Sequence, residues 1–248
     1  MTGLLLVLAL AGSVRATTRD GSTHTGGLTT PHGSVRRGLS STTVDNIDGL
    51  YTCIATSGSV CDVTDNIVLS APITIDSVST TIMSSNSAAL DGGGSQRLFD
   101  ITNGAQVTFR GIILKSGSSG EGGCVWIEGS NVTFSHSTLT NCEGTEGGGI
   151  YAKDNASVIL DSATLSHCSA DYGGGLWAER SSTISAKSSN FSACTAGTYG
   201  GGIRLDSSGV KFTSINSLFE SCSAGSDVGS ENLDSDHARI YCTAHRVS

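Results

Sequence analysis

Apolar and polar residues alternate in short runs along most of the chain, beginning near Asn46. In one run Val158-Ile-Leu160 is followed by Asp161, and in the next run Ile184 and Ala186 alternate with serine. Alternation with a period of two predicts half-buried β-strands, and Ser, Asn, Asp or Gly corners bound each run. No helical period interrupts the pattern, so it favours an all-β chain.

A glycine motif recurs four times in the second half of the chain. Each copy has two or three glycines followed by a strand-like run, and the copies start at Gly122, Gly147, Gly173 and Gly200. These starts are 25, 26 and 27 residues apart, and a second marker, Leu-x-x-Cys or Phe-x-x-Cys, keeps nearly the same spacing. The cysteines of this marker are Cys142, Cys168, Cys194 and Cys222. Two independent markers with one period indicate a repeat protein.

Units of this length are too small to bury their own apolar faces, so the sequence predicts that they stack on one another. Short strands, about three per turn, would pair in parallel between turns at roughly 4.8 Å. Two aliphatic columns fit the interior of such a stack, namely Val125, Ile150, Leu176 and Ile203, and Ile127, Ala152, Ala178 and Leu205. The glycines mark a corner that needs a positive φ or a close backbone approach. We therefore predict a single parallel β-helix of about seven coils.

The chain divides into expected segments of different character. Leu4–Ala11 is a short apolar run, and Val14-Arg15-Ala16 after it is typical of a signal-peptidase site. The segments are residues 1–16 as a signal peptide, 17–45 as a flexible Ser/Thr/Gly-rich stretch, 46–66 as an N-terminal cap, 67–224 as the β-helix repeats, and 225–248 as a degenerate last coil or C-terminal cap. The apolar run is far shorter than the roughly 18 residues that cross a bilayer. We therefore expect no membrane-spanning segment and a secreted or extracellular-surface location.

Composition narrows the classes of protein that remain. The 248 residues include 33 Gly and 2 Pro, with 15% charged and 5% aromatic residues, which excludes a coiled coil or an ordinary helical globule. Hydrophobic residues make up 37%, which is enough for a narrow core of aliphatic side chains. The net charge of −8 disfavours nucleic acids and anionic membranes as partners.

Eight cysteines permit disulfides in an exported chain. Cys53 and Cys61 are close enough in the sequence to close a loop in the predicted cap. The cysteines of the second marker would stack about 4.8 Å apart, within the Cα range of a disulfide. This cysteine column forms either cross-coil disulfides or a buried stack of free thiols, and both alternatives stay open. Cys124 and Cys242 have no evident partner.

Modification and metal sites are few. Three Asn-x-Ser/Thr sequons, at Asn131, Asn155 and Asn190, are glycosylation candidates in a eukaryotic host. The sequence contains no CxxC pair and no cluster of histidines, so we expect neither a metal nor a cofactor.

A further column points outward from the predicted coils. Its members directly follow inward aliphatic residues and include both tryptophans of the chain, as Trp126, Tyr151, Trp177 and Arg204. Two positions further along runs a charged row of Glu128, Lys153, Glu179 and Asp206. Exposed rings beside charges suit a polysaccharide ligand, because sugar C–H faces rest on rings while hydroxyls bond to polar neighbours. The alternative is an aromatic ladder that only stabilises the sheet, with Arg204 stacked at its end.

The repeat markers carry a family resemblance. Gly-Gly-Gly-Ile-Tyr at Gly147 and the Leu-x-x-Cys and Phe-x-x-Cys markers resemble the GGAI and FxxN repeats of chlamydial polymorphic outer-membrane proteins, whose passenger regions resemble pectate-lyase-like right-handed β-helices. Leu90-Asp-Gly-Gly-Gly94, followed by Arg97-Leu-Phe99 and Val107–Gly111, is similar to the entry turns of the same solenoids. The resemblance covers about Ile67–Ala224 and implies a right-handed fold. Cys replaces the Asn of FxxN, and no outer-membrane role is carried over.

The sequence lacks the motifs that enzymes of similar fold use. Pectate lyases place acidic calcium ligands and a basic Arg on one exposed face, and polygalacturonases resemble one another in NTD, Asp-Asp, GHG and RIK motifs; neither set is present. Glu179 and Asp206, on adjacent predicted coils, are the candidates for the two carboxylates that a glycosidase needs.

These observations favour a secreted or cell-surface module for non-catalytic adhesion and recognition, with an extracellular polysaccharide or glycoprotein as its partner. A polysaccharide-active enzyme, a lyase or glycoside hydrolase on the same scaffold, is the alternative. A structural wall or sheath protein is the second alternative.

Overall fold

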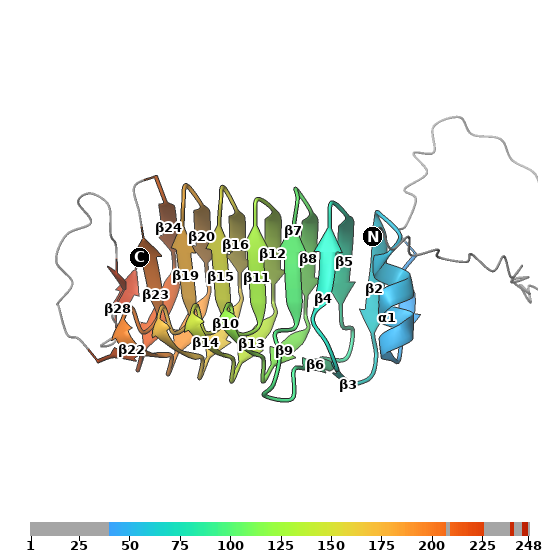
Figure 1. Ribbon diagram of the computed structural model, residues 1–248, viewed down its shortest axis with the longest axis horizontal. Helices are drawn as coiled ribbons and strands as arrows, with labels where there is room; N and C mark the ends of the chain where they lie inside the picture. The colour runs from blue at the N-terminus through green and yellow to red at the C-terminus, as the bar shows by residue number, and fades with distance from the viewer. Residues whose placement is uncertain (1–39, 207–208, 226–238, 241–244, 248) are drawn as a thin grey trace, which may run out of the picture. The chain divides into compact units, whose positions relative to one another are not determined.

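The computed structural model describes residues 40–206, 209–225, 239–240 and 245–247. In this part of the chain, short strands wind into successive coils, and equivalent strands of neighbouring coils lie side by side (Figure 1). Successive coils pair in parallel through hydrogen bonds, as in the register of β8, β12 and β16 (Gln106–Arg110, Asn131–Ser135 and Ser157–Asp161). The predicted all-β parallel β-helix is confirmed.

Four sheets run along the stack in the described residues. Sheet A consists of β1 (Thr42–Val44), β2 (Ser59–Val63), β5 (Ser79–Met83), β8, β12, β16, β20 (Thr183–Lys187) and β24 (Lys211–Ile215). Sheet B consists of β3 (Ile67–Val68), β6 (Ala89–Asp91), β9 (Ile113–Lys115), β13 (Thr138–Thr140), β17 (Thr164–Ser166), β21 (Asn190–Ser192), β25 (Ser217–Glu220) and β28 (His245–Val247).

The other two sheets meet along the glycine motifs. Sheet C consists of β4 (Ile73–Asp76), β7 (Phe99–Thr102), β11 (Val125–Glu128), β15 (Ile150–Lys153), β19 (Leu176–Glu179), β23 (Ile203–Asp206) and β27 (Arg239–Ile240). Sheet D consists of β10 (Ser118–Glu121), β14 (Glu143–Glu146), β18 (Ser169–Tyr172), β22 (Thr195–Tyr199) and β26 (Ser223–Ala224). The strands β27 and β28 pair antiparallel with β23 and β25.

The first strand begins earlier than the sequence predicts. Thr42–Val44 form β1 and pair in parallel with β2, although residues 17–45 were expected to be flexible. Val44 is fully buried, so this strand belongs to the core. The predicted signal peptide at residues 1–16, most of the predicted last segment, and Cys242 lie outside the described residues.

The interior is built from columns of like residues. The register places the members of each predicted aliphatic column one above another, and all of them are buried. Aromatic residues stack in the same way. The ring centres of Phe109 and Phe134 lie 5.1 Å apart, and those of Phe191 and Phe219 lie 4.7 Å apart. Each coil therefore buries its apolar side chains against the next coil, which it could not do alone.

A short helix covers one end of the stack. Helix α1 (Ile47–Ile54) lies beside β2 at the N-terminal end in Figure 1. The side-chain oxygen of Asn46 caps it by accepting a hydrogen bond from the backbone N–H of Gly49 at 2.9 Å. A disulfide between Cys53 and Cys61 ties the helix to β2, so the structure contains this predicted bond. No helix among the described residues has the length and apolarity needed to cross a bilayer.

The coil of β4, β5 and β6 has the predicted three strands, whereas the coils from β7 onward contain a fourth, in sheet D. One coil runs through β11, β12, β13 and β14, and the glycine motif then turns the chain from sheet D into sheet C. Gly147 has a φ of 68° and Gly173 has a φ of 65° at this corner. A Cβ on Gly147 would lie 2.2 Å from the carbonyl oxygen of Ile150, so no side chain fits there. The glycines thereby fix the place where each coil turns.

Candidate functional site

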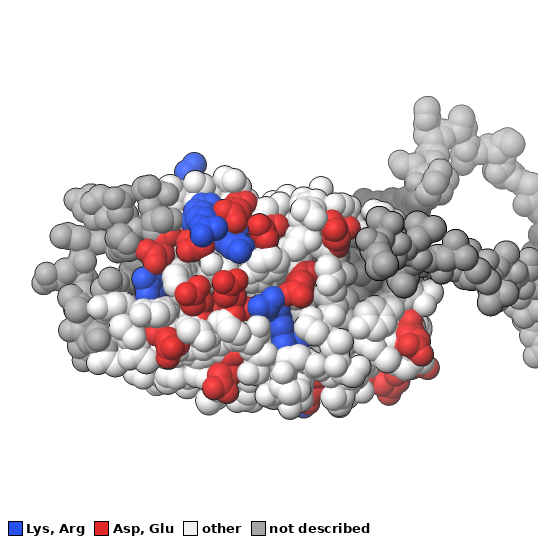
Figure 2. Space-filling view, viewed as in Figure 1, with Lys and Arg blue, Asp and Glu red and all other residues white. Residues whose placement is uncertain are grey.

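The predicted outward column lies where sheets C and D meet at the glycine corner. We define the C/D face by its residues on the two sheets, which are Glu121, Glu146, Tyr172 and Tyr199 from sheet D and Trp126, Tyr151, Lys153, Trp177, Glu179, Arg204 and Asp206 from sheet C. The sheet D members stack in register on successive coils. Figure 2, viewed onto sheet C, shows acidic and basic side chains side by side.

Two of the predicted ligand-binding rings are not exposed. Tyr151 is 3% exposed and Trp177 is 6% exposed, so the expectation of a row of open aromatic faces is wrong at these positions. The ring centre of Tyr172 lies 5.6 Å from that of Trp177, and the guanidinium carbon of Arg204 lies 4.7 Å from it. The unpredicted sheet D contributes at Trp177, because it carries Tyr172 up to this ring, and Tyr151 packs against Trp177 in turn, with ring centres 5.7 Å apart. Trp126 and Arg204 are half-buried.

Arg204 is held among three aromatic rings. Its guanidinium carbon lies 4.4 Å from the ring centre of Tyr172, 4.7 Å from Trp177 and 5.6 Å from Tyr199. Its Nη2 also pairs with Oδ2 of Asp206 at 2.7 Å. Each cation–π contact stabilises by about 0.5–2 kcal/mol, depending on how far the cation is desolvated. This end of the column therefore has the contacts of a stabilising ladder.

The other end of the column is more open. Trp126 is half-buried, and its Nε1 donates a hydrogen bond to Oε2 of Glu121 at 3.0 Å. The Nζ atom of Lys153 lies 4.8 Å from the ring centre, and the guanidinium carbon of Arg97 lies 5.6 Å from it. The indole here combines a satisfied N–H with a ring that solvent still reaches.

Trp177 lacks the partner that Trp126 has. Two coils along from Glu121, the register places Tyr172 at the equivalent position of sheet D. Nε1 of Trp177 is buried without a hydrogen-bond partner in the described residues, and so are Nε and Nη1 of Arg204. A buried donor without a partner lowers stability by about 1–3 kcal/mol, so an acceptor at any of these groups would be stabilising.

The two carboxylates singled out as catalytic candidates already have partners. Glu179 accepts a hydrogen bond from the hydroxyl of Tyr151 at 2.8 Å and pairs with Nε of Arg180 at 3.2 Å. Asp206 pairs with Arg204. Burial and the hydrogen bond to Glu179 raise the pKa of Tyr151, which keeps the phenol a donor. Both carboxylates thus help to hold the ladder in place.

Glu146 is the carboxylate that sequence reasoning missed. Burial, together with the negative charges of Glu121 and Glu179, raises the pKa of Glu146 above its ordinary value of 4.5. Its carboxylate forms no hydrogen bond or ion pair with the rest of the described chain. A signal was present in the sequence, because the residue just before each glycine motif forms a column of its own. That column is Glu121, Glu146, Tyr172 and Tyr199.

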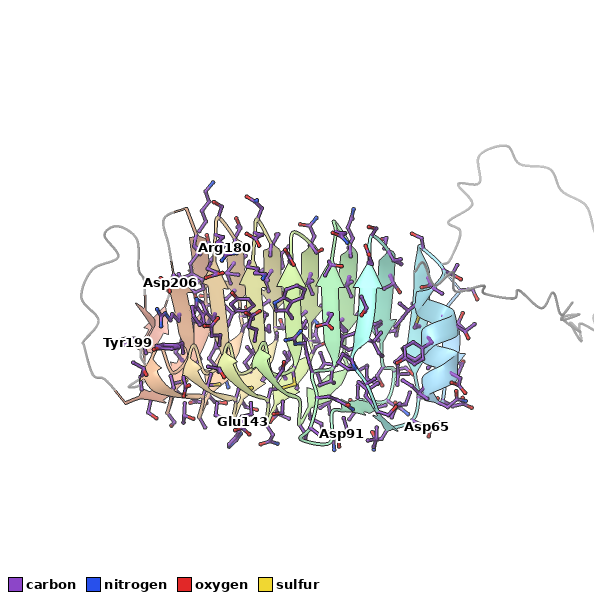
Figure 3. The ribbon with its side chains drawn as sticks, in the orientation of Figure 1. Asp65, Asp91, Glu143, Arg180, Tyr199 and Asp206 are labelled. Atoms are coloured by element: carbon purple, nitrogen blue, oxygen red, sulfur yellow. A yellow bond between two sulfur atoms is a disulfide. The ribbon has the colours of Figure 1, made fainter. Side chains whose placement is uncertain are left out.

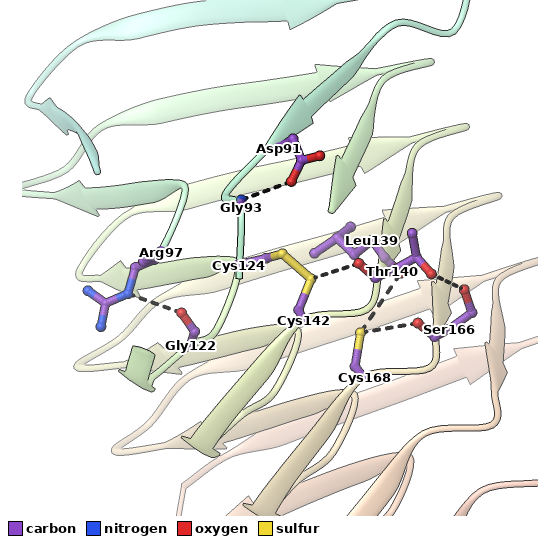
Figure 4. The surroundings of a disulfide bond; sticks show 10 residues. All are labelled: Asp91, Gly93, Arg97, Gly122, Cys124, Leu139, Thr140, Cys142, Ser166 and Cys168. Carbon is purple, nitrogen blue, oxygen red and sulfur yellow. Dashed lines mark hydrogen bonds between the residues drawn. A yellow bond between two sulfur atoms is a disulfide. The ribbon is translucent and has the colours of Figure 1, made fainter. Parts of the chain in front are cut away.

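A second disulfide joins Cys124 to Cys142 (Figure 4). It corrects one expectation, because Cys124 does have a partner, and it takes Cys142 out of both alternatives for the cysteine column. Cys168 and Cys194 are buried free thiols, as the second alternative proposed. Hydrogen bonding with Cys168 and Cys222, together with burial, raises the pKa of the Cys194 thiol. Thiols in this state are poor nucleophiles.

The repeat itself explains why Cys124 finds a partner. Cys124 occupies the third position of its glycine motif, and on the next two coils the glycine at this position lies beside a cysteine of the column. A Cβ on Gly149 would lie 3.4 Å from Sγ of Cys168, and one on Gly175 would lie 3.5 Å from Sγ of Cys194. Only the coil with a cysteine in place of that glycine can close a disulfide within itself.

The sequons differ in their surroundings. Asn131 and Asn155 are exposed. Asn190 is half-buried in β21, where its Nδ2 donates to Oε1 of Glu220 at 3.4 Å and its Oδ1 is buried without a partner among the described residues. Among the described residues, no group of three or more His, Cys, Asp or Glu side chains could hold a metal ion.

Comparison with known families agrees with this geometry. Residues 56–241 match the model of the right-handed β-helix region. Neither the comparison with curated proteins nor the comparison with solved structures gave a significant match. The family match covers most of the chain and spans the coils of sheets A to D, and therefore the chain belongs to the right-handed β-helix family.

Proposed function

We propose that this chain is a non-catalytic recognition module that binds polysaccharide along the C/D face. The observation that carries the proposal is a set of half-buried rings beside carboxylates, with Trp126, Tyr172 and Tyr199 next to Glu121 and Glu146. The rings of Tyr172 and Tyr199 stack along the coil axis with centres 6.2 Å apart. Sugar C–H faces pack on such rings, and carboxylates accept hydrogen bonds from hydroxyls.

A secreted or cell-surface location fits this role. The predicted signal peptide at residues 1–16 supports export. The chain is acidic and its described part exposes few large apolar residues, which also suits an extracellular, hydrated matrix.

Glu146 favours an enzyme as the second candidate. A general acid needs a carboxyl that keeps its proton toward neutral pH beside another carboxylate, and Glu146 has a raised pKa near Glu121 and Glu179. The ladder around Arg204 in turn favours a structural wall or sheath protein, because its cation–π contacts stabilise the stack without any ligand.

Glycan binding tests the proposal directly. The purified chain is applied to an array of plant, algal and microbial polysaccharides, and the variants Trp126→Ala and Tyr172→Ala are applied in parallel. Loss of one ring that packs on a sugar should weaken binding about tenfold, because such a contact contributes roughly 1–1.5 kcal/mol. Circular dichroism confirms that each variant keeps its β structure.

Tyr51→Ala is the matched control. Tyr51 is 44% exposed on α1, outside the C/D face, so its loss should leave glycan binding unchanged. An array that stays blank, or binding that survives both ring variants, contradicts the proposal. If the chain depolymerises the bound glycan, and Glu146→Gln abolishes this activity, the chain is an enzyme instead.

A further inference from the structure

Negative charge gathers around one rung of the C/D face. Glu121, Glu179 and Asp206 all lie close enough to Glu146 to disfavour its ionisation, and Arg204 is the base that opposes them there. Arg204 is already paired with Asp206. Glu146 and Glu121, which are neighbours in the register of sheet D, therefore form an acidic pair on this face with no ion pair to a base of the described residues.

The neighbouring coil contributes an unpaired donor. Trp177 is more than nine-tenths buried, and its Nε1 has no acceptor in the described residues. On the coil of Trp126, the equivalent N–H is directed at the residue just before the glycine motif, which is Glu121. On the coil of Trp177 the equivalent residue is Tyr172, which pairs with Glu146 in the register and brings no carboxylate to this N–H. Buried donors are nearly always paired in proteins, so an acceptor from outside the described residues is required.

We propose that the C/D face selects a basic glycan, with amino sugars of the glucosamine type, over uronic acid polymers. This inference rests on the proposed polysaccharide binding. An ammonium group pairs with the carboxylate of Glu146, a sugar ring packs on Tyr172 and Tyr199, and a hydroxyl oxygen accepts from Nε1 of Trp177. The carboxylate of Glu146 and the N–H of Trp177 then each have a partner of the opposite kind, while Nε and Nη1 of Arg204 stay among the three aromatic rings.

The charges decide between the possible sugars. A uronate carboxylate on this rung would lie among Glu121, Glu146 and Glu179, where like charges repel it. A neutral sugar would leave Glu146 without an ion-pair partner. The stacked rings of Tyr172 and Tyr199 favour a glycan over a lysine-rich peptide, because flat ring faces match the C–H faces of sugars.

Calorimetry with defined hexamers tests the selection on the full chain. The probes are the glucosamine hexamer, the N-acetylglucosamine hexamer, the galacturonate hexamer and hexalysine, all at slightly acidic pH and low salt. We expect the glucosamine hexamer to bind at least tenfold more tightly than the N-acetyl hexamer, and the galacturonate hexamer to bind most weakly. Glu146→Gln should remove most of the difference between the two glucosamine-type hexamers.

Glu143→Gln provides the matched control. Glu143 is exposed on the same strand, β14, and makes the same change in net charge. In Figure 3 it projects from the lower edge of the stack, away from Tyr199 and Asp206. This variant should keep the full preference for the glucosamine hexamer.

The outcomes separate this inference from the proposed function. Binding of the galacturonate or N-acetyl hexamer as tightly as the glucosamine hexamer overturns the inference and leaves polysaccharide recognition standing. Hexalysine binding as tightly as the glucosamine hexamer also overturns it, because charge alone would then account for affinity. A chain that binds none of the hexamers and no glycan on the array contradicts the proposed function itself.

Discussion

The two tryptophans occupy the same position of the repeat and have different surroundings. Trp126 is half-buried, its N–H is bonded to Glu121, and the ammonium of Lys153 lies over its ring. Trp177 is almost completely buried, its N–H has no partner in the described residues, and the guanidinium of Arg204 lies over its ring. Both tryptophans have the same position in the repeat, so the position alone does not determine the burial or the hydrogen bonding of the side chain.

The difference comes from the residues that stack on each ring. Sheet D brings a glutamate to Trp126 and brings Tyr172 to Trp177. In a solenoid each coil contacts only its neighbours, so a change of one residue in the column alters one rung and leaves the others as they are. One face of a regular scaffold can therefore hold a stabilising ladder at one end and a site with unsatisfied groups beside it.

The largest expected effect separates the tryptophans by stability. Trp177→Ala should lower the free energy of unfolding by about 3 kcal/mol, because it removes a buried ring from among Tyr151, Tyr172 and Arg204. Trp126→Ala should cost only about 1 kcal/mol, since its ring is half-exposed. Urea unfolding followed by circular dichroism measures both. Equal losses in the two variants would remove the distinction between the two rungs.

A smaller effect tests the hydrogen bond of Trp126. Glu121→Ala removes the acceptor of its N–H and makes this rung resemble that of Trp177, so we expect a loss of about 1 kcal/mol. Glu143→Ala removes an exposed carboxylate of the same sheet and should change stability by less than about 0.5 kcal/mol. The same urea experiment compares the two variants, and identical results would show that the bond to Glu121 contributes nothing.

The smallest effect concerns pH. The folded state raises the pKa of Glu146, so it binds this proton more tightly than the unfolded chain does. The contribution of Glu146 to stability is therefore fully present below 4.5, its ordinary pKa, and is lost as the pH rises through the raised value. Glu146→Gln should remove this loss, so that the variant gains stability relative to the parent as the pH rises. Thermal midpoints measured from acidic to neutral pH check the sign, and a parent that gains stability over that range relative to the variant contradicts it.

The fold could be predicted because its period is marked by residues that few other residue types can replace. Glycine at the corner and aliphatic residues in the inward columns have few substitutes, since a Cβ at Gly148 would lie 2.4 Å from the carbonyl oxygen of Gly174. The inward position of Ile150 and Leu176, one above the other, follows from the same spacing. The spacing of these residues in the sequence therefore predicts which residues pair between neighbouring coils.

The site was harder to predict because it depends on which sheet covers which side chain. Sheet D consists of short polar strands such as Glu143–Glu146, which lack the aliphatic alternation that marks the other strands. With no pattern to reveal sheet D, the sequence predicts open rings at Tyr151 and Trp177 and gives no sign that Glu146 lies beside them. The pairing of Cys124 with Cys142 was missed for a similar reason, because it crosses the coil between positions that share no repeat marker.

The glycine corner also fixes the distance between equivalent residues of successive coils along the stack. Since each coil must turn at the same place, residues of one column follow one another at the strand spacing of roughly 4.8 Å, whatever their chemistry. Substitutions on the outer surface can change the side chain that each coil presents, but the positions of these side chains along the stack stay evenly spaced. A partner with its own linear repeat would therefore contact successive coils at regular intervals. Adding or removing one coil would lengthen or shorten this surface and leave the other coils unchanged.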